Sequence, residues 1–183
     1  MTVKGHLLLA YPLATTILTL TEQNYFGHRI SDNATFMTLF YLGIFIGTIF
    51  PDIDEPESYI GRKLPVISHI LSIFIEHRGI THYLLIPLLI LTFNFLYVEE
   101  QSTKIVIYAF AIGNICHDVG DLLTKGGIRG FFFPLMPTTT IGLLPKFLRF
   151  RTNSLVEYIF MIFLIGLNVY GINFLIHKNF FHF

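Results

Sequence analysis

Two polar stretches carry most of the side chains that could bind a metal ion. The first runs from Gly47 to Leu85 and the second from Gly113 to Gly127. Only 13% of the chain is charged, so this concentration of acids and histidines beside apolar segments needs a chemical reason. Imidazole nitrogens and carboxylate oxygens are the ligands that zinc and similar divalent cations bind. The potential ligands in the two stretches are Asp52, Asp54, Glu55, His77, His82, His117, Asp118 and Asp121.

His117 and Asp121 have the spacing of two ligands on one helix. Residues i and i+4 share a helical face, so both side chains could hold the same ion. The pair alone is a weak signal, because a histidine near a helix end often lies beside an acid without any metal. Asp118 points elsewhere on such a helix, and we expect it to orient a ligand or to face water.

The segment from His77 to His82 is a more specific motif. On a regular helix, residues five apart lie about 140° apart, so the two rings would not chelate one ion from a helix. Gly79 allows a bend between them, and Thr81 could cap the helix that follows. A turn of this kind can bring both rings inward. The alternative is a loop histidine followed by a capped helix start.

The sequence Pro51-Asp52-Ile53-Asp54 places two carboxylates two residues apart, directly after an apolar run. A capping role would normally need only one of them. We therefore predict Asp52 as a metal ligand and Asp54 as either a second ligand or a group that transfers protons. Arg62, Lys63 and Arg78 are predicted to hold an anionic substrate group. Taken singly, each is better explained as a solvated loop side chain.

The rest of the chain is typical of a membrane protein. Its 183 residues are 53% hydrophobic with a mean hydropathy of +0.64, whereas soluble domains average about 25% charged residues. We expect one all-α domain over residues 1–183, a polytopic helical bundle with about four to five membrane helices. Core helices of a soluble protein are the alternative, but few polar faces are present to solvate them. The zero net charge argues against nucleic acid as a partner.

The topology of five helices would bring the candidate ligands together. The apolar runs cover residues 6–21, 34–50, 84–98, 105–116 and 154–175. Nine of the twelve basic residues fall on one side of the membrane and three on the other, which predicts a cytoplasmic N-terminus and cytoplasmic long loops. All the candidate ligands lie on that side, together with His6 at the start of the chain and Glu157 at the start of the last helix. We therefore predict a metal site at the cytoplasmic face.

Five motifs occur in a distinctive order over most of the chain: GHLLLAYPLA, PDIDEPESYIGRKL, HRGITHYLL, GNICHDVGDLLTKGGI and RTNSLVE. Together they resemble the YdjM-like family, bacterial inner-membrane proteins assigned to the metal-dependent hydrolases. The resemblance implies metal-site positions at His6, Asp52, His77, His82, His117 and Asp121, with Glu157 matching a late family acid. Glu55 departs from the family, where histidine is frequent, which leaves the number and identity of the metal ions open. The family more distantly resembles zinc-dependent phospholipase C and single-strand nucleases, which implies phosphate-ester chemistry.

These observations favour a membrane-bound hydrolase. One or two divalent ions, with zinc as the first candidate, would activate water for attack on an ester or phosphoester of a lipid-like substrate. Asp54 or Glu157 would transfer the protons. Phe131, Phe132 and Phe133 could anchor the loop in the headgroup layer, or simply pack. The alternatives are an ion- or metal-handling protein and a metal-stabilised scaffold without activity. An ion path needs polar residues throughout the membrane depth, whereas these cluster at one boundary.

Overall fold

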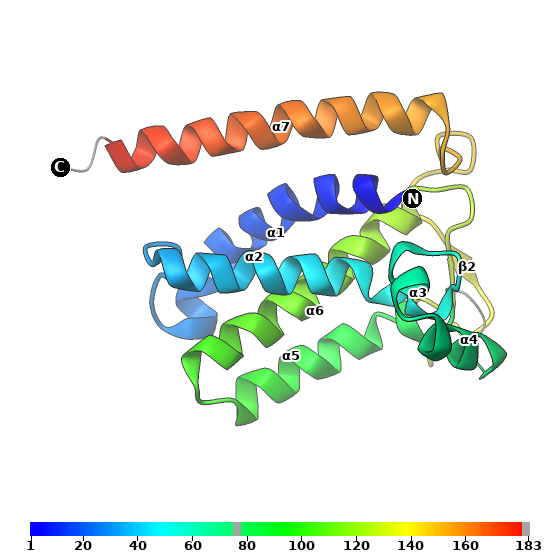
Figure 1. The fold of residues 1–183 in the computed structure, drawn as a ribbon, viewed down its shortest axis with the longest axis horizontal. Helices are drawn as coiled ribbons and strands as arrows, with labels where there is room; N and C mark the ends of the chain where they lie inside the picture. The colour runs from blue at the N-terminus through cyan, green and yellow to red at the C-terminus, as the bar shows by residue number, and fades with distance from the viewer. Residues whose placement is uncertain (75–77, 181–183) are drawn as a thin grey trace.

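Five long helices form the body of the protein in the computed structural model, which describes residues 1–74 and 78–180, with side chains described through residue 170 (Figure 1). Six short elements lie between them. The long helices are α1 (Val3–Phe26), α2 (Ala34–Ile49), α5 (Leu85–Tyr97), α6 (Gln101–Leu122) and α7 (Leu155–Phe180). The short elements are η1 (Pro51–Asp54), α3 (Tyr59–Lys63), α4 (Pro65–Phe74), η2 (Ile80–His82), β1 (Ile128–Arg129) and β2 (Thr140–Ile141).

Three segments of the described chain are long and apolar enough to cross a membrane. They are Val3–Phe26, Ala34–Asp54 and Gln101–Leu122, and a span needs about 20 residues. α5 has 13 residues, and the part of α7 whose side chains are described, Leu155–Tyr170, is also shorter than that criterion. The structure therefore supports a mostly helical protein with three candidate spans among the described residues, and the expectation of four to five membrane helices stays a prediction.

α1 is longer than the sequence suggested. Its N-cap is Thr2, whose hydroxyl accepts a hydrogen bond from the main-chain N–H of Gly5, and the helix continues through Pro12 to Phe26. Residues 22–26, which follow the apolar run 6–21, are still helical, because the buried carboxylate of Glu22 is satisfied locally. This carboxylate accepts hydrogen bonds from the main-chain N–H groups of Ile30 and Ser31. A buried acid with such partners does not end a helix.

α2 and α6 pack closely because small residues face each other across the contact. A Cβ atom added at Gly47 would lie 2.0 Å from the main-chain oxygen of Phe110, and one added at Gly113 would lie 2.6 Å from that of Ile44. Gly43, one turn before Gly47, faces the Cβ of Ala109. Small residues spaced by four positions allow the backbones of membrane helices to approach in this way. The contact fixes the end of α2 relative to the last turns of α6.

The short elements and the N-terminus gather at one end of the bundle, beside the ends of α2 and α6 and the start of α7 (Figure 1). α7 is attached there by Glu157, whose Oε1 accepts hydrogen bonds from the main-chain N–H and the hydroxyl of Thr2. Asn168 holds α7 further along by donating to the main-chain oxygen of Leu8. At the opposite end, the exposed Glu100 caps α6, and hydrogen bonds from Thr103 and Ser102 lower its pKa to about 2.

Candidate metal centre

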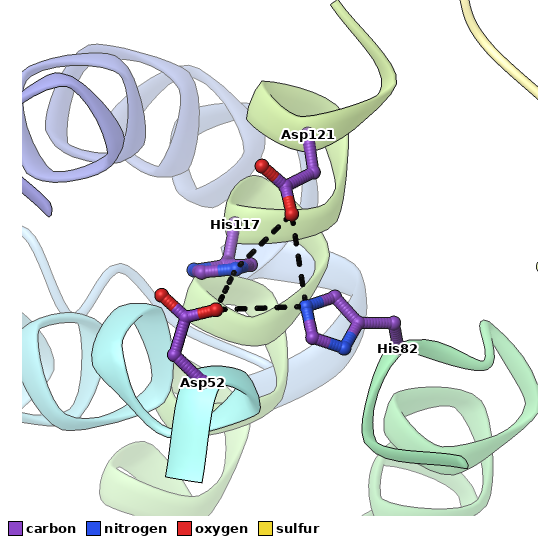
Figure 2. Close-up of side chains that lie close together, drawn as sticks. All are labelled: Asp52, His82, His117 and Asp121. Atoms are coloured by element: carbon purple, nitrogen blue, oxygen red, sulfur yellow. Dashed lines mark ion pairs between the residues drawn. The ribbon is translucent and has the colours of Figure 1, made fainter. Parts of the chain in front are cut away.

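Four side chains from three elements converge at the end of the bundle where the short elements lie. Asp52 comes from η1, His82 from η2, and His117 and Asp121 from the last turns of α6 (Figure 2). One ligand atom from each lies within 4.8 Å of all the others. His82, His117 and Asp121 are buried and Asp52 is half-buried. Residues 69 positions apart along the chain therefore share one small polar site.

The distances within this quartet fit a single small cation. Oδ1 of Asp52 lies 3.5 Å from Nε2 of His117 and 3.9 Å from Nε2 of His82. Oδ2 of Asp121 lies 3.8 Å from Nε2 of His82 and 3.9 Å from Nε2 of His117. Zinc bonds of about 2.0–2.2 Å put neighbouring ligands of a tetrahedron roughly 3.3–3.6 Å apart, so these four atom pairs would close by up to about 0.6 Å around such an ion. Two imidazoles and two carboxylates are also a donor set suited to zinc, iron or manganese.

Hydrogen bonding sets the tautomer of both histidines. Nδ1 of His117 lies 2.7 Å from the main-chain oxygen of Thr48, which can only accept, so Nδ1 carries the proton. Nδ1 of His82 lies 3.0 Å from the Thr81 hydroxyl, and that hydroxyl donates to Oδ2 of Asp54 at 3.2 Å. The hydroxyl proton is thus used, and Nδ1 of His82 must donate to the hydroxyl oxygen. In the neutral rings, both Nε2 atoms then carry a lone pair directed at the two carboxylates, as metal ligation requires.

His6 adjoins the quartet. Its ring stacks on the ring of His117 with centroids 3.8 Å apart and planes 3° apart, and its Nε2 lies 3.4 Å from Oδ1 of Asp121. Both ring nitrogens are buried, and neither is hydrogen-bonded to any of the described residues. Gly120 makes room for this ring, because a Cβ there would lie 2.7 Å from Nδ1 of His6. His6 is thus placed to reach Asp121 or a second ion beside the first.

Asp121 also has cationic protein partners. Arg78 reaches it through two nitrogens, with Nε 2.9 Å from Oδ2 and Nη2 3.0 Å from Oδ1. The α-amino group of Met1 lies 2.5 Å from Oδ1. Arg78 has a left-handed backbone with φ of 62°, and its Nη1 also donates to the main-chain oxygen of Gly127. The predicted substrate-binding arginine is therefore engaged with a candidate ligand.

The other predicted residues lie around this centre or outside it. Asp54 is buried behind His82 and bonds Thr81, so it is not a member of the quartet. Glu157 uses both oxygens for hydrogen bonds, from Thr2 and from the main-chain N–H of Asn153, which is the arrangement of a residue that positions the chain. Arg62 and Lys63 are exposed on α3. His77 lies outside the described residues.

Two further predictions can be compared with the structure. Asp118 is fully buried and so does not face water, and neither of its oxygens has a hydrogen-bond partner among the described residues. Phe131 is buried with Leu122 and Ile128, whereas Phe132 and Phe133 remain about 40% exposed. At most two of the three phenylalanines are therefore available as an interfacial anchor.

Sequence reasoning missed three residues that shape the site. Thr81 was considered only as a helix cap, although a hydroxyl between a candidate histidine and the carboxylate of Asp54 can orient the ring. Thr48 acts through its main-chain oxygen, and no side-chain type signals that. Gly120 lies between His117 and Asp121 in the helical motif, where a glycine without a turn indicates close packing.

Comparisons with known proteins agree with the motif analysis. A family model described as YdjM inner membrane protein matches residues 1–176. The chain is 29% identical to the uncharacterised protein YvsG of Bacillus subtilis over 136 residues, which are 74% of this chain and 79% of that protein. It is 33% identical to the inner membrane protein YdjM of Escherichia coli over 82 residues, which are 44% of this chain and 42% of that protein. No solved structure matches the chain.

Proposed function

The chain belongs to the YdjM family of inner membrane proteins, and from this premise we propose that it is a membrane-bound, metal-dependent hydrolase. Its substrate class is an ester or phosphoester in a lipid-like molecule. The observation that carries the proposal is the quartet of Asp52, His82, His117 and Asp121, whose ligand atoms lie within 4.8 Å of one another. Buried acids and histidines are rarely gathered at one membrane boundary unless they have a function.

The candidate ligands would hold one or two metal ions in this proposal. Asp52, His82, His117 and Asp121 hold a divalent cation, with zinc the first candidate because of the mixed nitrogen and oxygen donors. When bound, such a cation activates water near neutral pH and polarises the bond to be cleaved. His6 and, from the family resemblance, His77 are the residues that would serve a second ion.

The surrounding polar residues position the ligands and bind substrate. Asp54 orients His82 through Thr81, and we assign it this positioning role ahead of direct proton transfer. Arg78 fixes the carboxylate of Asp121 with a hydrogen bond from Nη2 and an ion-pair contact from Nε. Arg62 and Lys63 are free of the quartet and exposed at the same end of the bundle, so they are the better candidates to meet an anionic headgroup.

The proposed location of the centre is the cytoplasmic face of the inner membrane. It rests on the nine basic residues that share the side of the candidate ligands, against three on the other side. The ligands lie at the ends of α2 and α6 and in the turns that follow, which suits a substrate that approaches from the headgroup layer. A transport path would instead need polar groups along the membrane depth.

Hydrolysis by purified protein tests this function. The full chain in detergent would be loaded with Zn²⁺ or Mn²⁺ and assayed with bis(p-nitrophenyl) phosphate, p-nitrophenyl phosphate and p-nitrophenyl butyrate. We expect metal-dependent turnover of at least one ester, which is lost in His117→Ala and kept in His69→Ala, an exposed histidine on α4. If every loaded sample is inactive although the metal is bound, the centre is a stabilising scaffold and the proposal fails.

A further inference from the structure

A cavity of about 780 Å³ opens beside the quartet, between the start of α1, the end of α2, α3 and the start of α7. We propose that this cavity is the binding site for a phosphate-bearing amphiphile, with its hydrocarbon chain held between α1, α2 and α7. The proposal rests on the proposed function, because the quartet would have to act on the phosphate group of the bound molecule. Its substrate-binding part rests on the shape and lining of the cavity and on a cation held by the quartet, and does not require hydrolysis.

One wall of the cavity is chemically suited to a headgroup. Asp52 and Asp121 of the quartet line it together with Arg78, and Lys4 and Arg62 lie at its rim. Glu55 and Glu57 line it too, so that protein charges of both signs nearly cancel. A divalent cation held by the quartet makes the cavity net positive, which favours an anionic group such as phosphate.

Part of the cavity lining is apolar and comes from the long helices of the bundle. Leu7 comes from α1, Phe45 from α2 and Met161 from α7, and all three are half-buried. Phe45 precedes Asp52 by seven residues, so the apolar part reaches about 10 Å along α2 from the acidic wall. Leu7 and Phe45 both lie on candidate membrane spans. The hollow therefore leads from the polar centre into the hydrocarbon region.

The attachment of α7 to α1 holds one side of this cavity in place. α7 lies along α1 and is tied to it at Thr2 and at Leu8 (Figure 1). These hydrogen bonds hold Met161 beside the N-terminal turns of α1, and the Thr2 hydroxyl lies 3.7 Å from its sulfur. A substrate with both a phosphate and an alkyl chain matches the two halves of the cavity, whereas a free phosphate would use only one.

Alkyl phosphates of increasing length test this site without any need for turnover. Metal-loaded protein in detergent would be titrated by calorimetry with inorganic phosphate and with butyl, hexyl and octyl phosphate, after subtraction of titrations into detergent alone. We expect affinity to rise by about fourfold for each methylene that enters the cavity. Equal affinity for inorganic phosphate and octyl phosphate would overturn the proposal.

A pair of neighbouring variants on α7 tests where the alkyl chain of the ligand binds. Met161→Trp narrows the cavity and should remove most of the gain with chain length, whereas Ile162→Trp places the same ring at a position 69% exposed and should keep the gain. Phe45→Trp on α2, with the exposed Ile46→Trp as its control, gives an independent second pair if Met161→Trp does not fold. A chain-length gain that is unchanged in both cavity variants contradicts the proposal.

The outcomes separate this inference from the proposed function. If affinity rises with alkyl-chain length but the protein hydrolyses no ester, the amphiphile site is supported and the proposed hydrolase function is contradicted. If the protein hydrolyses soluble esters but its affinity does not rise with alkyl-chain length, the amphiphile site is contradicted and the proposed hydrolase function stands.

Discussion

Nδ1 of His117 donates a hydrogen bond to the main-chain oxygen of Thr48 at a distance of 2.7 Å. This bond joins the last turns of α6 to the end of α2, and it sets the tautomer that directs Nε2 of His117 toward Asp52. Packing of the two helices and orientation of a candidate metal ligand are therefore coupled. Changes in the packing of α2 against α6 should therefore change the position of His117 and the metal affinity of the centre.

Gly47→Ala tests this coupling. A Cβ at Gly47 would lie 2.0 Å from the main-chain oxygen of Phe110, so α2 must move away from α6. We expect a destabilisation of about 1–3 kcal/mol together with weaker metal binding, measured by circular dichroism on heating and by metal titration. Gly166→Ala on α7 is the control, since no atom lies within 4 Å of its added Cβ. Unchanged stability and metal binding in Gly47→Ala would contradict the close packing.

Thr81→Val tests whether the hydroxyl between Asp54 and His82 orients the ring. Valine keeps the shape but removes the donor to Asp54 and the acceptor for His82. Loss of such an outer partner typically weakens metal affinity by about 10- to 100-fold. Competition with a chromogenic chelator measures the affinity, and Thr81→Ser should restore it. A valine variant with the affinity of the original protein would show that the ring needs no such support.

Arg78→Lys tests the fork on Asp121. Lysine keeps the positive charge but cannot make the paired contacts of Nε and Nη2. We expect a loss of roughly 1.5–3 kcal/mol in the free energy of unfolding, the range for hydrogen bonds to charged groups. Thermal unfolding in detergent measures it, with the exposed Arg62→Lys as the matched control. Equal losses in both variants would argue against a specific role for the guanidinium of Arg78.

α4 is predicted to lie in the headgroup layer of the membrane. Five apolar side chains of this ten-residue helix are exposed, while Ser68 on the opposite side is buried. They are Val66, Ile67, Ile70, Ile73 and Phe74. Such a helix lies in the interface plane with its apolar face toward the acyl chains.

Fluorescence can measure the depth of α4, because the chain contains no tryptophan. Ile70→Trp and His69→Trp each introduce a single fluorophore, on the apolar and the polar side of the helix. In bilayers with acyl-brominated lipids, we expect strong quenching for Ile70→Trp and weak quenching for His69→Trp. Equal, weak quenching at both positions would place α4 in water.

Topology made much of the centre predictable from the sequence. His117 and Asp121 had a helical spacing, and successive membrane crossings put the segment of Asp52 and the segment of His82 at the same end as that helical pair. The sequence did not predict how close individual side chains lie to one another within the centre. The position of His82 depends on a short turn after Arg78, and the stacking of His6 on His117 depends on the missing side chain of Gly120.

Element lengths were harder to predict for a physical reason. Hydropathy alone ends α1 near Thr21, but the buried carboxylate of Glu22 finds main-chain partners and the helix continues. The strands β1 and β2 have two residues each, too few for a pattern of alternation. Local hydrogen bonding, which no composition reveals, determined both outcomes.

The bound metal of purified protein tests the central claim most directly. Elemental analysis of the full chain and of Asp52→Asn, His82→Ala, His117→Ala and Asp121→Asn should find at least one divalent ion per chain in the original protein. We predict that each of the four variants loses it and that His69→Ala retains it. Equal metal contents in the original protein and in His117→Ala would contradict a metal centre at these residues.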